Sequence, residues 1–283
     1  MNWSDLRRSG NVDDRRGMSG GGKVAIGGIG VFVVVILGLL TGQDPSAILN
    51  TIQNGQSSEQ QVQTRPEGPR PDDKTADMVS AILGSTEDVW GAIYKENGGQ
   101  YKTPSLQIFE NSSQSACGGA SSAMGPFYCP ADQKVYIDLS FCDELRDKFN
   151  APGDFAVAYV VAHEVGHHVQ NLMGITDQLQ QQRQRMSEEE YNKLSVKLEL
   201  QADFLAGVWA NHAQKMSNIL EPGDLEAALT AANAIGDDKL QKEAQGYVVP
   251  DAFTHGSSKQ RMYWFKKGFD TGDLNQGKYE DIQ

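Results

Sequence analysis

Two histidines, His163 and His167, have the spacing in this 283-residue chain that most clearly permits chemistry. On a helix, residues four apart face the same way, so both imidazoles could bind one metal ion. Glu164 follows the first histidine, where its carboxylate could act as a general base on a metal-bound water. A pattern of only three fixed residues recurs by chance, and a polar patch on a helix is the competing interpretation.

A third metal ligand is predicted in the segment ELQAD. Glu199 and Asp203 are again four residues apart on a predicted helix. One carboxylate could bind the metal, and the other could fix the orientation of a ligand histidine. The surrounding residues are apolar, which favours a site over an exposed acidic face. Gly166 and Gly207 would let the two helices approach each other closely, since glycine otherwise costs about 1 kcal/mol in a helix.

The other candidate ligands fit less well. His168 is rotated by about 100° from its neighbour on a helix and should point away from the metal. His212 lies 13 residues beyond Glu199 and on another face of its helix. A metzincin would have glycine and histidine where this chain has Gln170 and Met173, so that pattern is excluded. We therefore expect the glutamate to be the third ligand.

A hydrogen-bond donor to a developing oxyanion is expected near the metal, and His255 in the segment FTHGSSKQR is the candidate. Such a donor would contribute about 3 kcal/mol to catalysis. The alternative is that His255 makes a structural hydrogen bond while Ser257 caps the following helix. Tyr128 and Tyr136 are further candidate donors.

An extended peptide substrate could add to the edge of a strand above the metal helix. The segment KVYIDL, with Tyr136 and Ile137, is the candidate strand. The alternative is an internal strand that offers no free edge.

Helices should dominate the fold, with a small sheet. Asp154 is expected to cap the helix that carries the histidines, which should end at Gly174. Ser187 and Glu190 form a capping box that opens a long helix to about His212. Further helices are predicted over 223–235 and SKQRMYWFKKGF, two short helical pieces over 78–94 interrupted at Gly84-Ser85, and strands over 105–109 and 134–139.

The composition permits one substantial domain with appendages. The formal net charge is −12, from 25 lysines and arginines against 37 acidic residues. Neutralising nucleic-acid phosphates needs a surplus of basic residues, so this balance argues against a nucleic-acid partner.

Residues 24–40 form an uncharged apolar run of 17 residues and are predicted to be one transmembrane helix. Basic residues precede this run, so residues 1–23 are expected to be a cytoplasmic tail and the domain to lie outside the cytoplasm. A cleaved signal peptide is the competing interpretation, although the run is long for one.

Residues 41–75 are rich in glutamine, serine, proline and charge, which predicts a disordered linker. The folded domain is therefore assigned to 76–283. If this domain lies outside the cytoplasm, a disulfide is permitted there. Cys117 and Cys129 could pair and leave Cys142 free; the alternative is three reduced, buried cysteines.

Several sequence blocks together resemble the bacterial neutral zinc metallopeptidase family, which is membrane-anchored and gluzincin-like. The blocks are HEVGHHVQNL, ELQAD followed by FLAGVWA, CG…FYCPADQKVYIDL and FTHGSSKQRMYWFKKGFDTGD. The resemblance implies a zincin-like domain with one Zn²⁺ per chain, bound by His163, His167 and Glu199, and Glu164 as the base. Cys142 departs from the pattern, where an aromatic or aliphatic residue is expected.

We therefore expect a zinc-dependent peptidase that acts on peptides or proteins outside the cytoplasm. A catalytically silent, zinc-stabilised binding or adaptor domain tethered to the membrane is the alternative. The presence of Glu164 favours the enzyme, because a structural zinc site would close its fourth position with a protein ligand. The sequence indicates neither the substrate nor the oligomeric state.

Overall fold

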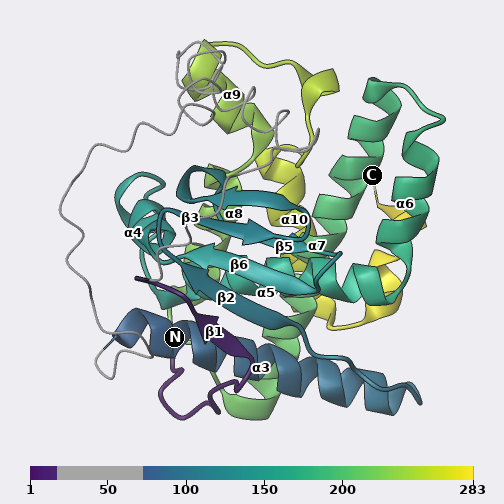
Figure 1. The fold of residues 1–283 in the computed structure, drawn as a ribbon. Helices are drawn as coiled ribbons and strands as arrows, with labels where there is room; N and C mark the ends of the chain where they lie inside the picture. The colour runs from purple at the N-terminus through teal and green to yellow at the C-terminus, as the bar shows by residue number, and fades with distance from the viewer. Residues whose placement is uncertain (18–72, 283) are drawn as a thin grey trace.

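The computed structural model describes residues 1–17 and 73–282, in which a small sheet packs against several helices (Figure 1). The helices are α3 (Lys74–Glu96), α4 (Ser140–Asp147), α5 (Asp154–Leu172), α6 (Ile175–Arg183), α7 (Glu188–Ser217), α8 (Asp224–Ala234), α9 (Asp237–Gln245) and α10 (Ser258–Thr271). Short 3-10 turns are η1 (Ser122–Met124), η2 (Pro250–Ala252), η3 (Leu274–Gly277) and η4 (Tyr279–Asp281). The prediction of a mainly helical α+β fold with a small sheet is confirmed.

The main sheet has the strand order β1-β2-β6-β5. The strands are β1 (Val12–Asp14), β2 (Ser105–Phe109), β6 (Lys134–Asp138) and β5 (Phe127–Cys129), and β3 (Ser112–Ser115) pairs with β4 (Gly118–Ser121) in a separate hairpin. β1, β2 and β6 are parallel, whereas β5 runs antiparallel to β6 at one edge. Both strands predicted from the sequence are present, and the other strands were not foreseen.

The prediction that KVYIDL offers a free edge to a substrate is wrong. β6 lies between β2 and β5, and neighbours on both sides use its backbone hydrogen-bonding groups. Tyr136 and Ile137 are also buried within the protein. The edge strand on this side of the sheet is β5.

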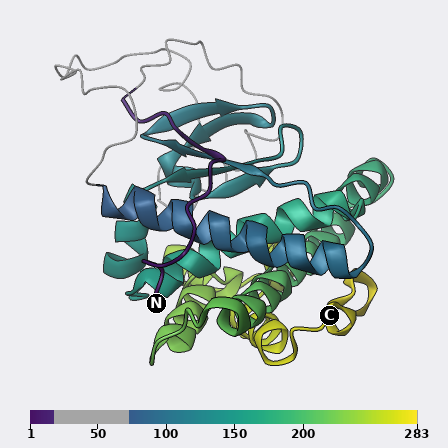
Figure 2. The same cartoon turned by 90° about the horizontal axis from the view of Figure 1, so that it is seen from below.

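Helix α5 occupies the centre of the molecule. It contacts β5 and β6 on one side and α7 and α8 on the other, and Figure 2 shows the sheet and these helices in separate layers. Its first half is buried all round, as the uninterrupted apolar run from Phe155 predicts. The helix ends before Gly174, as predicted, but Gly153 rather than Asp154 is the N-cap residue.

The capping box that begins α7 lies where the sequence places it, at Ser187 and Glu190. Ser257 caps α10 together with Gln260, which is the capping role given as the alternative when His255 was put forward as a donor. The close approach predicted at Gly166 is also present, since a Cβ there would lie 3.0 Å from the Ala202 carbonyl oxygen of α7. α7 extends past the expected end to Ser217.

Two glycines let α10 cross α7 at close range. A Cβ at Gly207 would collide with the Phe265 carbonyl oxygen, and a Cβ at Gly268 would collide with that of Phe204. Gly207 therefore serves the contact between α7 and α10, and the prediction that it serves the contact with the histidine helix is wrong. This crossing brings the first turn of α10 towards the centre of the molecule.

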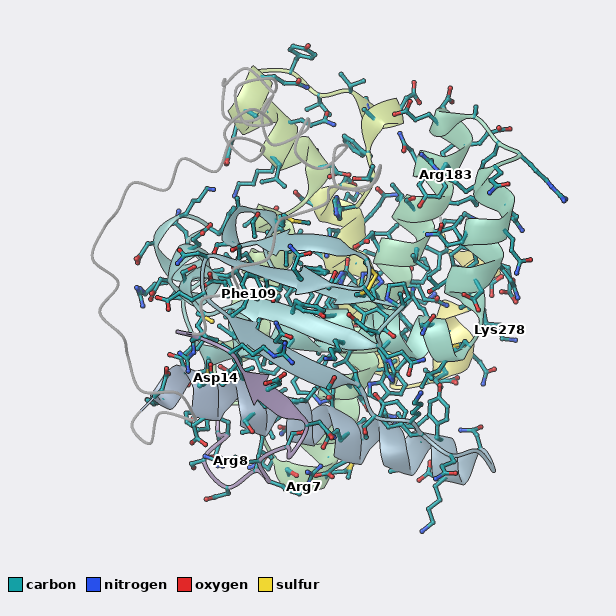
Figure 3. The ribbon with its side chains drawn as sticks, viewed as in Figure 1. Arg7, Arg8, Asp14, Phe109, Arg183 and Lys278 are labelled. Atoms are coloured by element: carbon teal, nitrogen blue, oxygen red, sulfur yellow. A yellow bond between two sulfur atoms is a disulfide. The ribbon has the colours of Figure 1, made fainter. Side chains whose placement is uncertain are left out.

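Helix α3 is continuous, so the predicted break at Gly84-Ser85 is wrong. Gly84 lies in mid-helix because the backbone of the N-terminal segment passes over it, and a Cβ would collide with the Arg7 carbonyl oxygen. Arg7 and Arg8 lie beside α3 in Figure 3. A glycine that permits close approach was thus mistaken for a helix breaker.

Residues 1–17 are part of the folded body, which corrects the expectation of a separate tail for this part of residues 1–23. Val12–Asp14 form β1 and pair in parallel with β2. The Trp3 side chain is buried, and its indole N–H donates to Asp154 at 2.7 Å. Residues 73–75, assigned to the linker, cap and begin α3.

Within residues 1–17 and 73–282, no helix has both the length and the apolar character needed to cross a membrane. The predicted transmembrane helix over 24–40 lies outside these residues, as does the predicted linker up to residue 72.

Cys117 and Cys129 form a disulfide, the pairing that the sequence analysis put forward. The bond joins the loop between β3 and β4 to the edge strand β5. Cys142 carries a free thiol on α4. Burial raises the pKa of this thiol to about 12, so it stays protonated at neutral pH.

Candidate metal centre

Helices α5 and α7 bring together the three side chains predicted to bind a metal. The Nε2 atoms of His163 and His167 lie 3.2 Å apart on one face of α5. Glu199 of α7 approaches both rings, with Oε2 at 3.1 Å from Nε2 of His163 and Oε1 at 3.5 Å from Nε2 of His167. All three offered atoms lie within 4.8 Å of one another.

These separations fit a tetrahedral zinc ion. Nitrogen and oxygen ligands at about 2.0 to 2.1 Å from zinc lie roughly 3.3 Å apart along the edges of a tetrahedron. The 3.2 Å between the two Nε2 atoms and the 3.1 Å from His163 Nε2 to Oε2 of Glu199 are close to this value, while His167 Nε2 lies 3.5 Å from the other carboxylate oxygen, Oε1. Among the described residues, no fourth histidine, cysteine, aspartate or glutamate joins the group. The donor set therefore fits zinc with one coordination position open.

Glu164 lies beside this group and keeps its carboxylate available. The residue is buried, with 7% of its surface exposed. In the described part of the chain, no hydrogen bond to its side chain is found, although the charges of His163 and His167 act on it. Burial raises the pKa of Glu164 above its ordinary value, and the two histidines oppose that rise. A carboxylate with a raised pKa and no fixed partner is suited to accept a proton.

A charged network fixes His163 from behind. Its Nδ1–H donates to Oδ1 of Asp203 at 2.8 Å, which leaves Nε2 directed at the metal position. The Tyr159 hydroxyl donates to the same Asp203 oxygen at 2.6 Å. Arg261 of α10 donates from Nε to Oδ2 of Asp203 at 2.8 Å and from Nη2 to Oδ1 at 3.0 Å. Helices α5, α7 and α10 thus each contribute to the orientation of one imidazole.

The electrostatics of this network favour its charged forms. Burial alone would raise the pKa of Asp203, but Arg261 and His163 lower it to about 2. Burial would likewise lower the pKa of His163, but Asp203 and Glu199 raise it to about 10 in the metal-free protein. A bound cation would take the place of the second proton on His163, because it needs the same lone pair on Nε2.

His167 is oriented by neutral amides instead. Its Nδ1 lies 2.8 Å from Oε1 of Gln170, one helical turn away. Nε2 of Gln170 donates to the Leu198 carbonyl oxygen at 2.6 Å and to Oε1 of Gln201 at 3.1 Å. Gln201 in turn donates to the Gly277 carbonyl oxygen at 3.0 Å. This chain of amides reaches from α5 to the C-terminal turns.

His255 lies on the loop that leads into α10, and Asp237 fixes this loop. Asp237 Oδ2 accepts from the backbone N–H of Thr254, His255 and Gly256, and its Oδ1 lies 3.2 Å from Nδ1 of His255. The His255 side chain is 50% exposed. Burial lowers the pKa of His255, but Asp237 and the charge of Glu199 raise it more. Because Nδ1 of His255 contacts Asp237, Nε2 is the ring nitrogen that could donate to a substrate.

The two tyrosines considered as oxyanion donors have other partners. The Tyr128 hydroxyl lies 2.9 Å from Nδ1 of His168, and the Tyr136 hydroxyl donates to Asp132 at 2.7 Å. His168 is fully buried, and its Nε2 donates to the Lys102 carbonyl oxygen, so it points away from the metal ligands as predicted. His212 bonds the Gly272 carbonyl oxygen at the end of α10.

Sequence reasoning missed the residues that support the ligands. These are Tyr159, Gln170, Gln201, Asp237 and Arg261. Gln170 had a usable signal, because it lies one helical turn beyond His167 on the same face. Arg261 had a weaker one, as a single arginine near the start of a helix whose next residues are mostly apolar and aromatic.

Comparison with known proteins agrees with this geometry. A model of the family described as "Putative neutral zinc metallopeptidase" matches residues 1–279. The chain belongs to this family. The match begins at the first residue, so the N-terminal segment that forms β1 is part of the family pattern.

Relatives within curated collections extend over most of the chain. "Uncharacterized protein YpfJ" of Escherichia coli (strain K12) is 48% identical over 285 residues, which cover 98% of this chain and 97% of the relative. "Uncharacterized protein Rv2575" of Mycobacterium tuberculosis is 41% identical over 207 residues, covering 70% of this chain and 68% of the relative. No solved structure matches the chain significantly.

Proposed function

We propose that this protein is a zinc-dependent peptidase that hydrolyses peptide bonds in extended polypeptide segments. The observation that carries the proposal is the convergence of His163, His167 and Glu199 at zinc-ligand spacing. Beside them lies the buried carboxylate of Glu164, for which no hydrogen bond is found among the described residues. Membership of the neutral zinc metallopeptidase family supports it.

The chemistry divides between the ion and the protein. Zinc held by three protein ligands supplies an open position that acidifies water and polarises a carbonyl. Glu164 accepts the proton of the attacking water and passes it to the leaving amine. His255, held by Asp237, donates a hydrogen bond to the oxygen on which negative charge develops.

The edge strand β5 is the proposed place for the substrate backbone. Within the described residues β5 pairs with β6 alone and is the last strand on this side of the sheet, which makes it the candidate to receive an added strand. β5 also contacts α5, which brings that edge to the helix of the metal ligands. An antiparallel edge strand beside the metal helix supports a zincin-like arrangement, in which an extended peptide adds to the sheet.

The disulfide between Cys117 and Cys129 supports a site of action outside the cytoplasm. Disulfides form and persist in oxidising compartments and are rare in the reducing cytosol. We therefore propose that the reaction takes place on the extracytoplasmic side.

The substitution Glu164→Gln tests the proposal. Zinc content should be unchanged, whereas hydrolysis of a proteome-derived peptide library should fall by about 10²- to 10⁴-fold, because general-base catalysis is removed. Glu188→Gln on the exposed start of α7 is the matched control and should keep full activity.

Two results would contradict the enzyme and favour the silent, zinc-stabilised binding domain. One is a zinc-loaded wild-type protein that cleaves no member of the library. The other is a Glu164→Gln variant that cleaves as fast as the wild type.

A further inference from the structure

We propose that Arg261 is a positioning residue of the metal centre, acting through Asp203 on His163. The proposal rests on the zinc site proposed above and assigns to α10 a part in building it. Arg261 does not contact the metal ligand atoms. Its Nη2 lies 3.4 Å from Nδ1 of His163, and its shorter contacts, at 2.8 and 3.0 Å, hold the carboxylate that holds the imidazole.

The geometry of the pair is specific. Nε and Nη2 of Arg261 grip the two oxygens of Asp203 at 2.8 and 3.0 Å, so the carboxylate cannot rotate. Both residues are buried, with 3% of Arg261 and none of Asp203 exposed. The oxygen that faces His163 is therefore fixed in place at 2.8 Å from Nδ1.

Arg261 is itself fixed from two sides. Its Nη1 donates to the Ile235 carbonyl oxygen at 3.2 Å, at the end of α8, and its Nη2 donates to the Tyr159 hydroxyl at 3.2 Å. The glycine crossing at Gly207 and Gly268 brings α10 close enough for these contacts. The guanidinium thus connects α8, α10 and α5 to one carboxylate.

A role in stability alone does not account for this arrangement. A buried ion pair is on average no more stabilising than well-packed apolar residues, because both charges lose their hydration. Here the donors of Tyr159, His163 and Arg261 converge on a single Asp203 oxygen, which defines the direction of the imidazole. Such outer contacts of a ligand histidine commonly change metal affinity by 10- to 100-fold.

The test measures zinc affinity of the full chain by competition with a chelator, without any substrate. Arg261→Met should weaken zinc binding by about 10- to 100-fold. The zinc affinity of Arg261→Lys should lie between those of Arg261→Met and the wild type, because lysine keeps the charge but lacks the planar guanidinium that binds both carboxylate oxygens. Lys266→Met removes a positive charge from an exposed position of the same helix and should leave the affinity unchanged.

The double variant Arg261→Met with Asp203→Asn separates positioning from loss of folding. All variants are compared at a temperature where circular dichroism shows them folded. If Arg261 acts through Asp203, the double variant should bind zinc no more weakly than Asp203→Asn alone. Wild-type affinity in Arg261→Met, or additive losses in the double variant, would overturn the inference. A wild-type protein without zinc would instead overturn the proposed function.

We also infer that residues 1–17 and residues 73–282 lie on the same side of any membrane that the chain meets. The N-terminal segment packs along helix α3 and forms hydrogen bonds to it. The buried carboxylate of Glu87 accepts from Arg7, Ser9 and Asn11 at 2.8, 2.6 and 2.7 Å. These three donors compensate the charge of Glu87 in its buried position beneath the segment, where a carboxylate without partners would be strongly unfavourable.

The sheet and the core add two independent contacts. β1 completes the sheet beside β2, with Leu106 donating to the Asn11 carbonyl oxygen and Arg15 donating to that of Ile108. Trp3 is buried against the domain. A single crossing of a membrane by 24–40 would place the two regions on opposite sides, and none of these contacts could then form.

Cysteine labelling tests this inference in cells that express the full chain. Asp5→Cys and Lys266→Cys place one thiol at an exposed position of each region. Each variant is treated with a membrane-impermeant maleimide before and after permeabilisation, and peptide mass spectrometry assigns the label to its residue. Detergent-solubilised protein provides the reference for full labelling.

Both positions should be labelled under the same condition, and from outside intact cells if the disulfide indicates the compartment. Labelling of both only after permeabilisation would keep the inference and contradict an extracytoplasmic site of action. One position labelled from outside and the other only after permeabilisation would overturn the inference.

Discussion

The two ligand histidines share one face of α5 but are supported in different ways. His163 is backed by a carboxylate, a guanidinium and a hydroxyl from three helices, all of them buried. His167 is backed by Gln170 and a neutral chain of amides. A carboxylate raises the basicity of an imidazole and fixes its tautomer, whereas an amide oxygen fixes the tautomer with little change in charge. The partners of His163 therefore set both its basicity and its orientation, whereas the partner of His167 sets mainly its orientation.

Removing the carboxylate of Asp203, which supports His163, should have the largest effect on stability. Asp203→Ala leaves the Arg261 guanidinium buried without its partner, so the free energy of unfolding of the metal-free protein should fall by about 3 to 5 kcal/mol. Urea denaturation measures this. Asp270→Ala removes an exposed carboxylate from α10 and should cost at most about 1 kcal/mol. Equal losses in the two variants would contradict the proposed importance of the buried pair.

Displacing α10 should also disturb the charged support of His163, because this helix carries Arg261. A Cβ at Gly207 would meet the Phe265 carbonyl oxygen, so Gly207→Ala should cost roughly 1 to 3 kcal/mol and weaken zinc binding by shifting Arg261. Gly91→Ala in α3 is the control, since its Cβ would meet nothing within 4 Å and alanine favours a helix. Unchanged stability and zinc affinity in Gly207→Ala would show that the helix crossing does not position the site.

Changes in the amide chain behind His167 should have smaller effects on stability and on zinc affinity. Gln170→Leu removes the partner of His167 and leaves the Gln201 amide without one of its contacts. The free energy of unfolding should therefore fall by about 1 to 2 kcal/mol. Zinc affinity should also fall less than in Asp203→Asn. Chelator competition on the two variants under one set of conditions decides the order, and the reverse order would refute the comparison between the two sides.

A third histidine extends the comparison to pH. Burial lowers the pKa of His255, but Asp237 and Glu199 give a net rise. If protonated His255 is the donor, activity is present at neutral pH and is lost as the pH rises through this raised pKa. Asp237→Asn removes one cause of the rise, so the alkaline limb of kcat/KM should move to lower pH. An unmoved limb would exclude His255 as the titrating group.

Local signals made part of the fold predictable. The capping box at Ser187 contains both partners within four residues, and α7 begins where these residues predict. The apolar run after Phe155 is long enough to show that α5 is central. Because His163 and His167 are four residues apart on α5, their shared direction followed from helix geometry, and the acidic pair Glu199 and Asp203 on α7 indicated where the third member of the group would come from.

Contacts between distant segments were not predictable. Glycine in mid-helix is normally unfavourable, so Gly84 indicated a break until the structure placed the Arg7 backbone against it. The short strand at Val12 has no periodic pattern and depends on pairing with residues about ninety positions away. Arg261 meets Asp203 only because α10 crosses α7, and a single sequence does not encode that crossing in a local pattern.

An anomalous-difference map at the zinc edge, from a zinc-loaded crystal of the full chain, tests the central claim most directly. The account predicts one strong peak per chain, about 2.0 to 2.2 Å from Nε2 of His163, Nε2 of His167 and a Glu199 oxygen, with no fourth protein ligand. A peak bound elsewhere, or a fourth side chain in the remaining coordination position, would contradict it.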